Sequence, residues 1–206
     1  MPAMSDERSD STTRRLAAGT RDGEAAKFDA LYNRVASALF LWASLRIPKS
    51  IRRLVEPEDL IQEVWCRALR RFATWDPEKG RFRTWLLGIA QKVLMEVLRR
   101  VNRSGRVPPT GSTPEVRVFD PEEIPEEVTT ACRRLARSEG VRALLDQVGF
   151  LGTEDRALLL ARGLEERPHA EIAEELDIDV ATVKKRWQRL RERLVKDLAV
   201  FEDLLA

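Results

Sequence analysis

The chain of 206 residues is 43% hydrophobic and 34% charged, which is typical of a globular protein with one or two domains and excludes a chain disordered throughout. Its net charge of +2 conceals a segregation, because basic residues gather at 81–106 and 182–196 and acidic residues at 114–127. Two cysteines are too few for a disulfide framework and lack metal-ligand spacing. No segment resembles a signal peptide or a membrane-spanning helix, so we expect a cytoplasmic protein without membrane insertion.

Periodicity divides the chain into two helical blocks. Residues 1–21 carry Ser, Thr, Arg and Asp without apolar periodicity, and we expect them to be disordered. Apolar residues recur at helical spacing in 22–103 and 128–206, whereas 104–127 is rich in proline and acids and predicts a flexible linker. No alternating strand pattern occurs. The prediction is an all-α protein of two small helical domains joined by a flexible acidic, Pro-rich linker, the second domain a helix-turn-helix.

Residues 56–72 predict an amphipathic helix. Its apolar positions are Leu60, Ile61, Val64, Trp65, Ala68, Leu69 and Phe72. Pro57 suits the first helical turn, and the acids precede the arginines on the polar face, as the helix dipole favours. The polar face is either a solvated surface or a docking surface for a protein partner, and spacing alone does not decide.

A turn at 76–81 leads into a second predicted helix that extends to 103. Its apolar positions are Trp85, Leu86, Ile89, Ala90, Val93, Leu94, Val97 and Leu98. Bases and aromatics alternate at its start, an arrangement that can hold a phosphate chain and stack unpaired bases. The alternative is that the aromatics are core residues: the two interpretations of Trp85 are about even, and core is favoured for Phe82.

Residues 168–196 predict a helix, a tight turn and a basic helix. Ile172, Ala173 and Leu176 give the first helix an apolar face, and Asp177 to Asp179 form the turn, with Asp179 as N-cap. The second helix has an apolar stripe of Val180, Val183, Trp187, Leu190 and Leu194. Its other face is strongly basic, which suits phosphates and base edges, although many amphipathic helices carry solvated Lys and Arg.

Together and in this order, the three segments resemble a bacterial RNA polymerase sigma factor of the extracytoplasmic-function (ECF) group of the sigma-70 family. The resemblance covers most of residues 24–196. DLIQEVWCRALRRF resembles the polymerase-binding helix, FRTWLLGIAQKVLMEVLRR the segment that reads and melts the minus-ten element, and 152–194 the minus-thirty-five domain. Only the helix-turn-helix is shared with many ordinary regulators, so the first two segments distinguish a sigma factor from such a regulator.

The resemblance implies site residues and partners. Core RNA polymerase would meet Asp59, Gln62, Glu63 and Arg67. The minus-ten element, with its melted non-template strand, would meet Arg81, Phe82, Arg83, Thr84, Trp85, Lys92, Arg99 and Arg100. Duplex minus-thirty-five DNA would meet Thr182, Lys184, Lys185, Arg186 and Arg189. An anti-sigma factor is a further expected partner that no residue of the sequence demonstrates, and the acidic linker would occupy cationic surface in the RNA exit path.

The chain departs from the family pattern at three positions. Lys92 and Glu96 stand where Asn and Asp are usual, which predicts a changed base preference or, at Lys92, a phosphate contact. Trp187 replaces a smaller aliphatic residue and predicts altered packing. The only histidine, His169, has no partner at ligand or triad spacing and is interpreted as a helix-start or surface residue.

The function expected is an alternative sigma factor that directs core polymerase to promoters and helps to melt them. The alternative is a dimeric helix-turn-helix regulator with a palindromic site that acts without being a polymerase subunit. An enzyme is disfavoured, since no phosphate loop, HExxH or nucleophile elbow occurs, and we predict no catalytic residue, metal or cofactor. Charge segregation also suggests that the free protein folds back and binds DNA poorly until polymerase separates the blocks.

Overall fold

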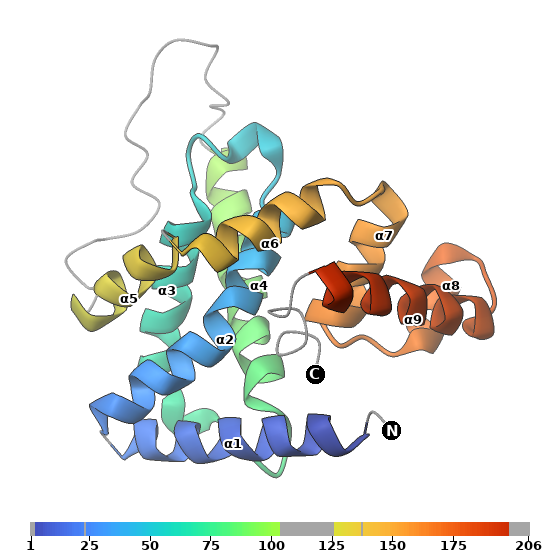
Figure 1. The fold of residues 1–206 in the computed structure, drawn as a ribbon. Coiled ribbons are helices and arrows are strands. Elements are labelled where there is room, and N and C mark those ends of the chain that lie inside the picture. Colours follow the sequence, from blue (N-terminus) through green and yellow to red (C-terminus); the bar gives the residue numbers. More distant parts are fainter. Residues whose placement is uncertain (1–2, 23, 104–125, 137, 198–206) are drawn as a thin grey trace.

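The computed structural model describes residues 3–22, 24–103, 126–136 and 138–197 (Figure 1). Its elements are α1 (Ala3–Arg21), α2 (Ala25–Arg46), η1 (Lys49–Ile51), α3 (Pro57–Arg70), η2 (Phe72–Thr74), α4 (Phe82–Arg103), α5 (Glu126–Ala136), α6 (Glu139–Gly149), α7 (Thr153–Leu158), η4 (Leu159–Leu164), α8 (His169–Leu176) and α9 (Val180–Asp197). Within the described ranges there is no strand, which confirms the all-α prediction. None of the described helices is long and apolar enough to cross a membrane.

The predicted disorder of residues 1–21 is wrong for 3–21, which form α1 along one side of α2 (Figure 1). Ala17 is fully buried and Thr13 nearly so, and the Arg34 Nε donates to the Thr13 hydroxyl at 2.9 Å. Small side chains let the two helices approach closely without a large apolar stripe. The polar composition of this segment therefore gave no sign of the helix, because the helix is stabilised by packing against α2.

The core of the first block lies between α2, α3 and α4 and is built on aromatic rings. Phe82 is at its centre, with ring centroids 5.4 to 6.3 Å from those of Trp65, Phe72, Trp75 and Trp85. Trp65 in turn packs on Tyr32, at a centroid distance of 5.0 Å. Such stacked, tilted and edge-on ring pairs add to the free energy of apolar burial, so the core of this block is rigid.

Helices α5 and α6, which open the second block, pack back on the first block rather than on α8 and α9 (Figure 1). The Tyr32 hydroxyl of α2 donates to the Cys132 Sγ of α5 at 2.9 Å in a buried contact, and burial raises the pKa of that thiol to about 12. Helix α5 begins at Glu126, two residues before the predicted domain boundary, and most of the predicted linker lies outside the described residues.

Helices α7 to α9 form the outlying part of the second block (Figure 1). Helix α8 ends at Asp177 in the left-handed conformation, with φ of 51°. The predicted N-cap is present, since the Thr182 backbone N–H donates to Asp179 Oδ1 at 2.9 Å. The predicted apolar stripes are wrong at Leu176 and Val180, which are 41% and 38% exposed because they flank the turn, where none of the described elements covers them.

Candidate nucleic-acid interface

The four predicted polymerase-facing residues lie on one side of α3. Pro57 starts the helix, and Glu58 and Asp59 occupy its first turn, as the dipole favours. Asp59 is exposed, whereas Gln62, Glu63 and Arg67 are partly buried. Packing around the start of α3 raises the pKa of the Asp59 carboxyl, chiefly by desolvation. Cys66, which is not among the predicted apolar positions of this helix, is also buried.

Arg67 joins two carboxylates from different helices. Its Nε donates to Glu63 Oε1 at 2.6 Å within α3, and its Nη1 donates to Glu96 Oε2 at 2.7 Å on α4. Burial alone would lower the pKa of the guanidinium, but the hydrogen bonds to Glu96 and Glu63 outweigh it and raise that pKa. Glu96, one of the departures from the family pattern, therefore ties α4 to α3.

The predicted minus-ten residues follow a structured turn at the start of α4. Asp76 Oδ1 accepts from the Glu78 backbone N–H at 3.0 Å, and its Oδ2 pairs with the Lys79 ammonium at 3.3 Å. Phe82 is fully buried, so the structure supports the core interpretation of this residue and leaves no exposed ring to stack on a base. Trp85 is partly exposed, with its ring against Phe72 and Phe82.

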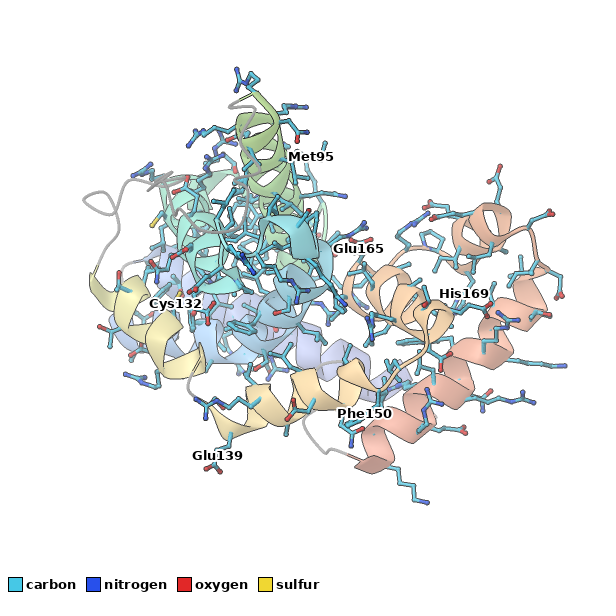
Figure 2. All side chains as sticks on the ribbon, turned by 90° about the horizontal axis from the view of Figure 1, so that it is seen from above. Met95, Cys132, Glu139, Phe150, Glu165 and His169 are labelled. Atoms are coloured by element: carbon cyan, nitrogen blue, oxygen red, sulfur yellow. The ribbon has the colours of Figure 1, made fainter. Side chains whose placement is uncertain are left out.

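The rest of the predicted minus-ten face lies along α4. Lys92 and Arg99 are exposed, as is Arg100 in the last turn. Met95 lies on the same exposed side and is 45% exposed (Figure 2). A line of cations beside an exposed apolar side chain suits a strand that presents both phosphates and unstacked bases.

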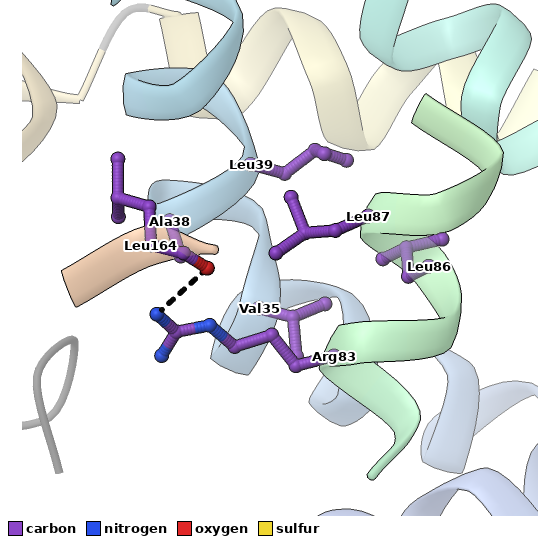
Figure 3. A pocket seen from close by; sticks show the side chains of 7 residues that line it. All are labelled: Val35, Ala38, Leu39, Arg83, Leu86, Leu87 and Leu164. Atoms are coloured by element: carbon purple, nitrogen blue, oxygen red, sulfur yellow. Dashed lines mark hydrogen bonds between the residues drawn. The ribbon is translucent and has the colours of Figure 1, made fainter. Parts of the chain in front are cut away.

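The polar side chains at the start of α4 contact the turn after η4. The Thr84 hydroxyl donates to Glu166 Oε2 at 2.9 Å, and Arg81 Nη1 and Arg83 Nε each lie 3.7 Å from Glu166 Oε1. Arg83 Nη2 also donates to the carbonyls of Gly163 and Leu164, the second at 3.3 Å (Figure 3). The aliphatic part of Arg83 closes one side of a small apolar pocket lined by Val35, Ala38, Leu39, Leu86, Leu87 and Leu164.

A second acid of the same turn is bound by α2. Glu165 lies where the η4 segment meets the first block (Figure 2). Its Oε1 accepts from Arg46 Nη2 at 2.6 Å, Arg46 Nε at 2.8 Å and the Trp42 indole N–H at 2.9 Å, and its Oε2 accepts from Arg46 Nη2 at 2.8 Å. The Glu165 side chain is 11% exposed, so this is a largely desolvated, charge-assisted contact.

The backbone of this turn is unusual. Helix α7 widens into π-helical η4, and the Glu165 N–H donates to Leu160 O, five residues back, at 2.9 Å. Glu166 follows with φ of 56°, a left-handed conformation that favours glycine. The wide turn and the positive φ together direct the two neighbouring carboxylates toward α2 and α4.

The predicted minus-thirty-five face of α9 is only partly open. Lys184, Lys185 and Arg189 are exposed. Arg186 Nη1 pairs with Glu154 Oε2 of α7 at 2.8 Å, and the Thr182 hydroxyl donates to the capping Asp179 carboxylate. The predicted apolar positions Val183, Leu190 and Leu194 are buried, and Trp187 is partly buried beside them.

Sequence reasoning missed the contact between the blocks. Glu165 and Glu166 give no signal, because an acid pair after a helix is ordinarily a solvated end. Trp42 and Arg46 lie at the end of an apolar helix and were not singled out. His169 begins α8 as expected, with its pKa lowered by burial and by the neighbouring charges of Arg162 and Lys184.

The family models that match this chain agree with the order of the segments. Residues 31–104 match the family model "Sigma-70 region 2" and residues 142–194 match "Sigma-70, region 4", together more than half of the chain. A curated relative, the ECF RNA polymerase sigma-E factor of Haemophilus influenzae, is 28% identical over 138 residues, covering 66% of this chain and 71% of the relative. A solved structure, that of CnrH in complex with the cytosolic domain of CnrY, is 22% identical with a TM-score of 0.39, covering 90% of this chain and 96% of that one.

Proposed function

Because the chain belongs to the sigma-70 family, as an ECF sigma factor, we propose that its two blocks divide promoter recognition between melted minus-ten DNA and duplex minus-thirty-five DNA. The protein is an alternative sigma factor that directs RNA polymerase in transcription initiation. The observation that carries this conclusion is the match of region 2 followed by region 4 in one chain. The dimeric regulator is not favoured, because such a protein would need only the helix-turn-helix.

Core polymerase is the partner proposed for the α3 face. Asp59, Gln62, Glu63 and Arg67 share one side of the helix, and Arg67 is held by carboxylates on both sides. Bonded side chains lose little conformational entropy when a partner docks, which favours this face over a freely solvated one. Polymerase would also fix the two blocks apart and place the acidic linker in cationic surface.

The start of α4 is proposed to hold the melted non-template strand. Arg81, Arg83 and Thr84 supply two cations and a hydroxyl, and the ring of Trp85 is partly exposed. Phe82 acts beneath them as part of the rigid core, because it is fully buried. Lys92, Arg99 and Arg100 extend the cationic face along α4 for phosphates. Unstacking a base costs a few kcal/mol, which base–aromatic stacking of about 1–3 kcal/mol per base offsets.

Helix α9 is proposed to enter the major groove of the minus-thirty-five element. The exposed Val180 and Ala181 at its start are small enough for close approach to the groove, and Lys184, Lys185 and Arg189 face outward. Thr182 and Arg186 are the other proposed contacts, and Arg186 must exchange Glu154 for DNA. We propose that the protein acts in the cytoplasm, without catalysis of its own. An anti-sigma partner stays a prediction, tested by copurification.

In vitro transcription with purified core polymerase on a genomic fragment library, with and without the protein, tests the function. Transcript starts that depend on the protein and share two elements at fixed spacing are the expected result. No new starts, together with duplex binding by the free protein as a dimer, would overturn it. The double variant D59N/Q62A should lose binding to core polymerase, whereas E139Q, an exposed acid at the start of α6, should not.

A further inference from the structure

We propose that the middle of α4 binds one unstacked base of the melted non-template strand, that Glu96 selects guanine there, and that Met95 contacts the face of the same base. The inference rests on the proposed function, since it takes α4 to be the helix that meets the melted strand. What it adds is a residue that determines base preference, together with the base that this residue prefers.

The base site consists of four residues that are neighbours on the surface of α4. Met95 and Glu96 lie three and four residues after Lys92, and Arg99 lies four and three residues after them. Side chains at these separations are adjacent on a helix, so the two cations bracket the thioether and the carboxylate. Lys92 and Arg99 are about 10 Å apart along the axis, because a helix rises about 1.5 Å per residue. Their long side chains can therefore meet the phosphates on either side of one nucleotide.

Met95 provides an apolar surface within this group of charges. It is 45% exposed (Figure 2), and among the described residues of the first block it is the exposed large apolar side chain. A single exposed apolar residue has no special meaning by itself, but this one lies beside a carboxylate and between two cations. A thioether makes favourable contacts with aromatic rings, so it suits the face of any base. Met95 therefore contributes affinity without base preference.

Glu96 is held in position by the neighbouring helix. Its Oε2 accepts from Arg67 Nη1 of α3 at 2.7 Å, and Arg67 Nε donates to Glu63 at 2.6 Å. Even so, the Glu96 side chain is 46% exposed. Within the described residues the bond to Arg67 occupies Oε2, which leaves Oε1 and the second lone pair of Oε2 to accept from a ligand. A fixed and accessible acceptor loses little conformational entropy when it binds a base.

A fixed carboxylate distinguishes unstacked bases by their hydrogen-bonding edges. An ionised carboxylate only accepts hydrogen bonds. The Watson–Crick edge of guanine carries two adjacent donors, N1–H and N2–H, which match the two oxygens of a carboxylate. On adenine, cytosine and thymine the donor of this edge has an acceptor beside it, which a carboxylate repels. Glu96 therefore favours guanine over the other three bases.

The test compares holoenzymes, the complexes of core polymerase with this protein, that contain either wild type or E96Q. The probe is a promoter fragment mapped by the transcription assay, with its minus-ten segment unpaired and the non-template bases of that segment randomised. Retained DNA is sequenced. We expect guanine to be enriched at one position by wild type and about tenfold less by E96Q, as for the loss of one bidentate base contact. Glutamine keeps an oxygen for Arg67, so E96Q should fold and retain DNA.

Inosine tests which atoms of the base are read. Placed at the enriched position, inosine differs from guanine only by the missing N2 amino group. Wild-type holoenzyme should bind the inosine probe about tenfold more weakly than the guanine probe, as for a lost hydrogen bond to a charged group. E96Q should bind the two probes equally. M95A should weaken the binding of both probes by the same factor, because its contact is with the face of the base.

A matched variant controls for a general effect of charge. D29N removes one negative charge from an exposed acid of α2 and should keep the enrichment of guanine. Circular dichroism verifies that every variant is folded.

Equal enrichment of guanine by E96Q and wild type would overturn the inference, and Glu96 would then only tie α4 to α3. Equal binding of the guanine and inosine probes by wild type would also contradict it. The proposed function fails separately, if the wild-type chain forms no holoenzyme that retains the library. Total retention and base composition are measured in the same experiment, so the two failures are distinguishable.

Discussion

The two blocks of this protein are stabilised by different kinds of side chain. The first block contains a cluster of seven aromatic rings, Phe82 and six others, all from α2, η2, α3, α4 and the residues between them. The helix-turn-helix is held by small and aliphatic residues, namely Ile172, Ala173, Val183, Leu190 and Leu194. No ring pair is found within its described residues.

The difference follows from what each block is proposed to do. A surface that binds the unstacked bases of a melted strand must be rigid, because deformation of the surface would cost part of the stacking free energy. Dense aromatic packing provides such a surface. Entering an intact major groove needs only a correctly held helix with a cationic face, for which a small aliphatic core is enough. The following predictions test this contrast, from the largest expected effect to the smallest.

The sharpest contrast is between two tryptophans. Trp65 is fully buried in the aromatic core, and W65A should lower the free energy of unfolding by about 3–5 kcal/mol. Trp187 is only partly buried on α9, so W187A should cost about 1–2 kcal/mol. Urea titrations followed by circular dichroism measure both. Equal losses would mean that the two cores do not differ as described.

Ion pairs give a second, smaller contrast. Arg67 is 27% exposed between Glu63 and Glu96, and R67M leaves the two carboxylates without their shared cation, so we expect a loss of about 1 kcal/mol after allowance for solvent screening. Arg186 pairs with Glu154, whose side chain is 80% exposed, and R186M should be near neutral. Thermal unfolding compares the two variants. A larger loss for R186M would reverse the expected ranking.

The N-cap of α9 gives a pH dependence confined to the second block. Hydrogen bonds from the Thr182 hydroxyl and backbone N–H hold the pKa of Asp179 below its ordinary value of 3.8. Because the folded-state pKa is the lower one, this stabilisation is present above the unfolded-state pKa and is lost as the pH falls through the folded-state value. Asparagine also caps helices but does not titrate. The melting temperature of D179N should therefore fall less than that of wild type when the pH is lowered. An equal decrease in melting temperature with pH in D179N and wild type would exclude the N-cap as a source of the pH dependence.

The smallest effect concerns a single cation of α9. Lys185 is exposed, and as a phosphate contact its loss in K185A should reduce the salt dependence of duplex promoter binding by about one unit in the slope of log K against log salt. Holoenzyme titrated with promoter duplex at several salt concentrations measures the slope. E192Q, an exposed acid on the same helix, serves as the control, and an unchanged slope in K185A would remove Lys185 from the interface.

Local patterns were enough for the helices and the turn of the second block. The positions of Pro57, Asp177 and Asp179 follow from backbone preferences that act within a few residues, and each occurs as expected. The apolar spacing likewise identified α3, α4 and α9. Caps, turns and apolar spacing depend on residues that are close in the chain, so a single sequence is enough to predict them.

Contacts between distant parts of the chain could not be predicted in the same way. Helix α1 has no strong apolar stripe, and its packing depends on the close approach that Ala17 allows on α2. The contact of Thr84 with Glu166 joins residues 82 positions apart, and nothing in either segment specifies the other. The residues of the candidate site stay a prediction from the sequence, whereas the contact of the second block with the start of α4 was found only in three dimensions.

The separation of Thr84 and Glu166 along the chain also has a consequence during synthesis. At about 5–20 residues per second, the ribosome needs about 4–16 seconds to add the 82 residues between them. For that time the start of α4 exists without the carboxylate that contacts it in the finished protein. The nearest polyanions are then the messenger and ribosomal RNA, so a nascent chain is most exposed to nonspecific RNA binding before its second half is made.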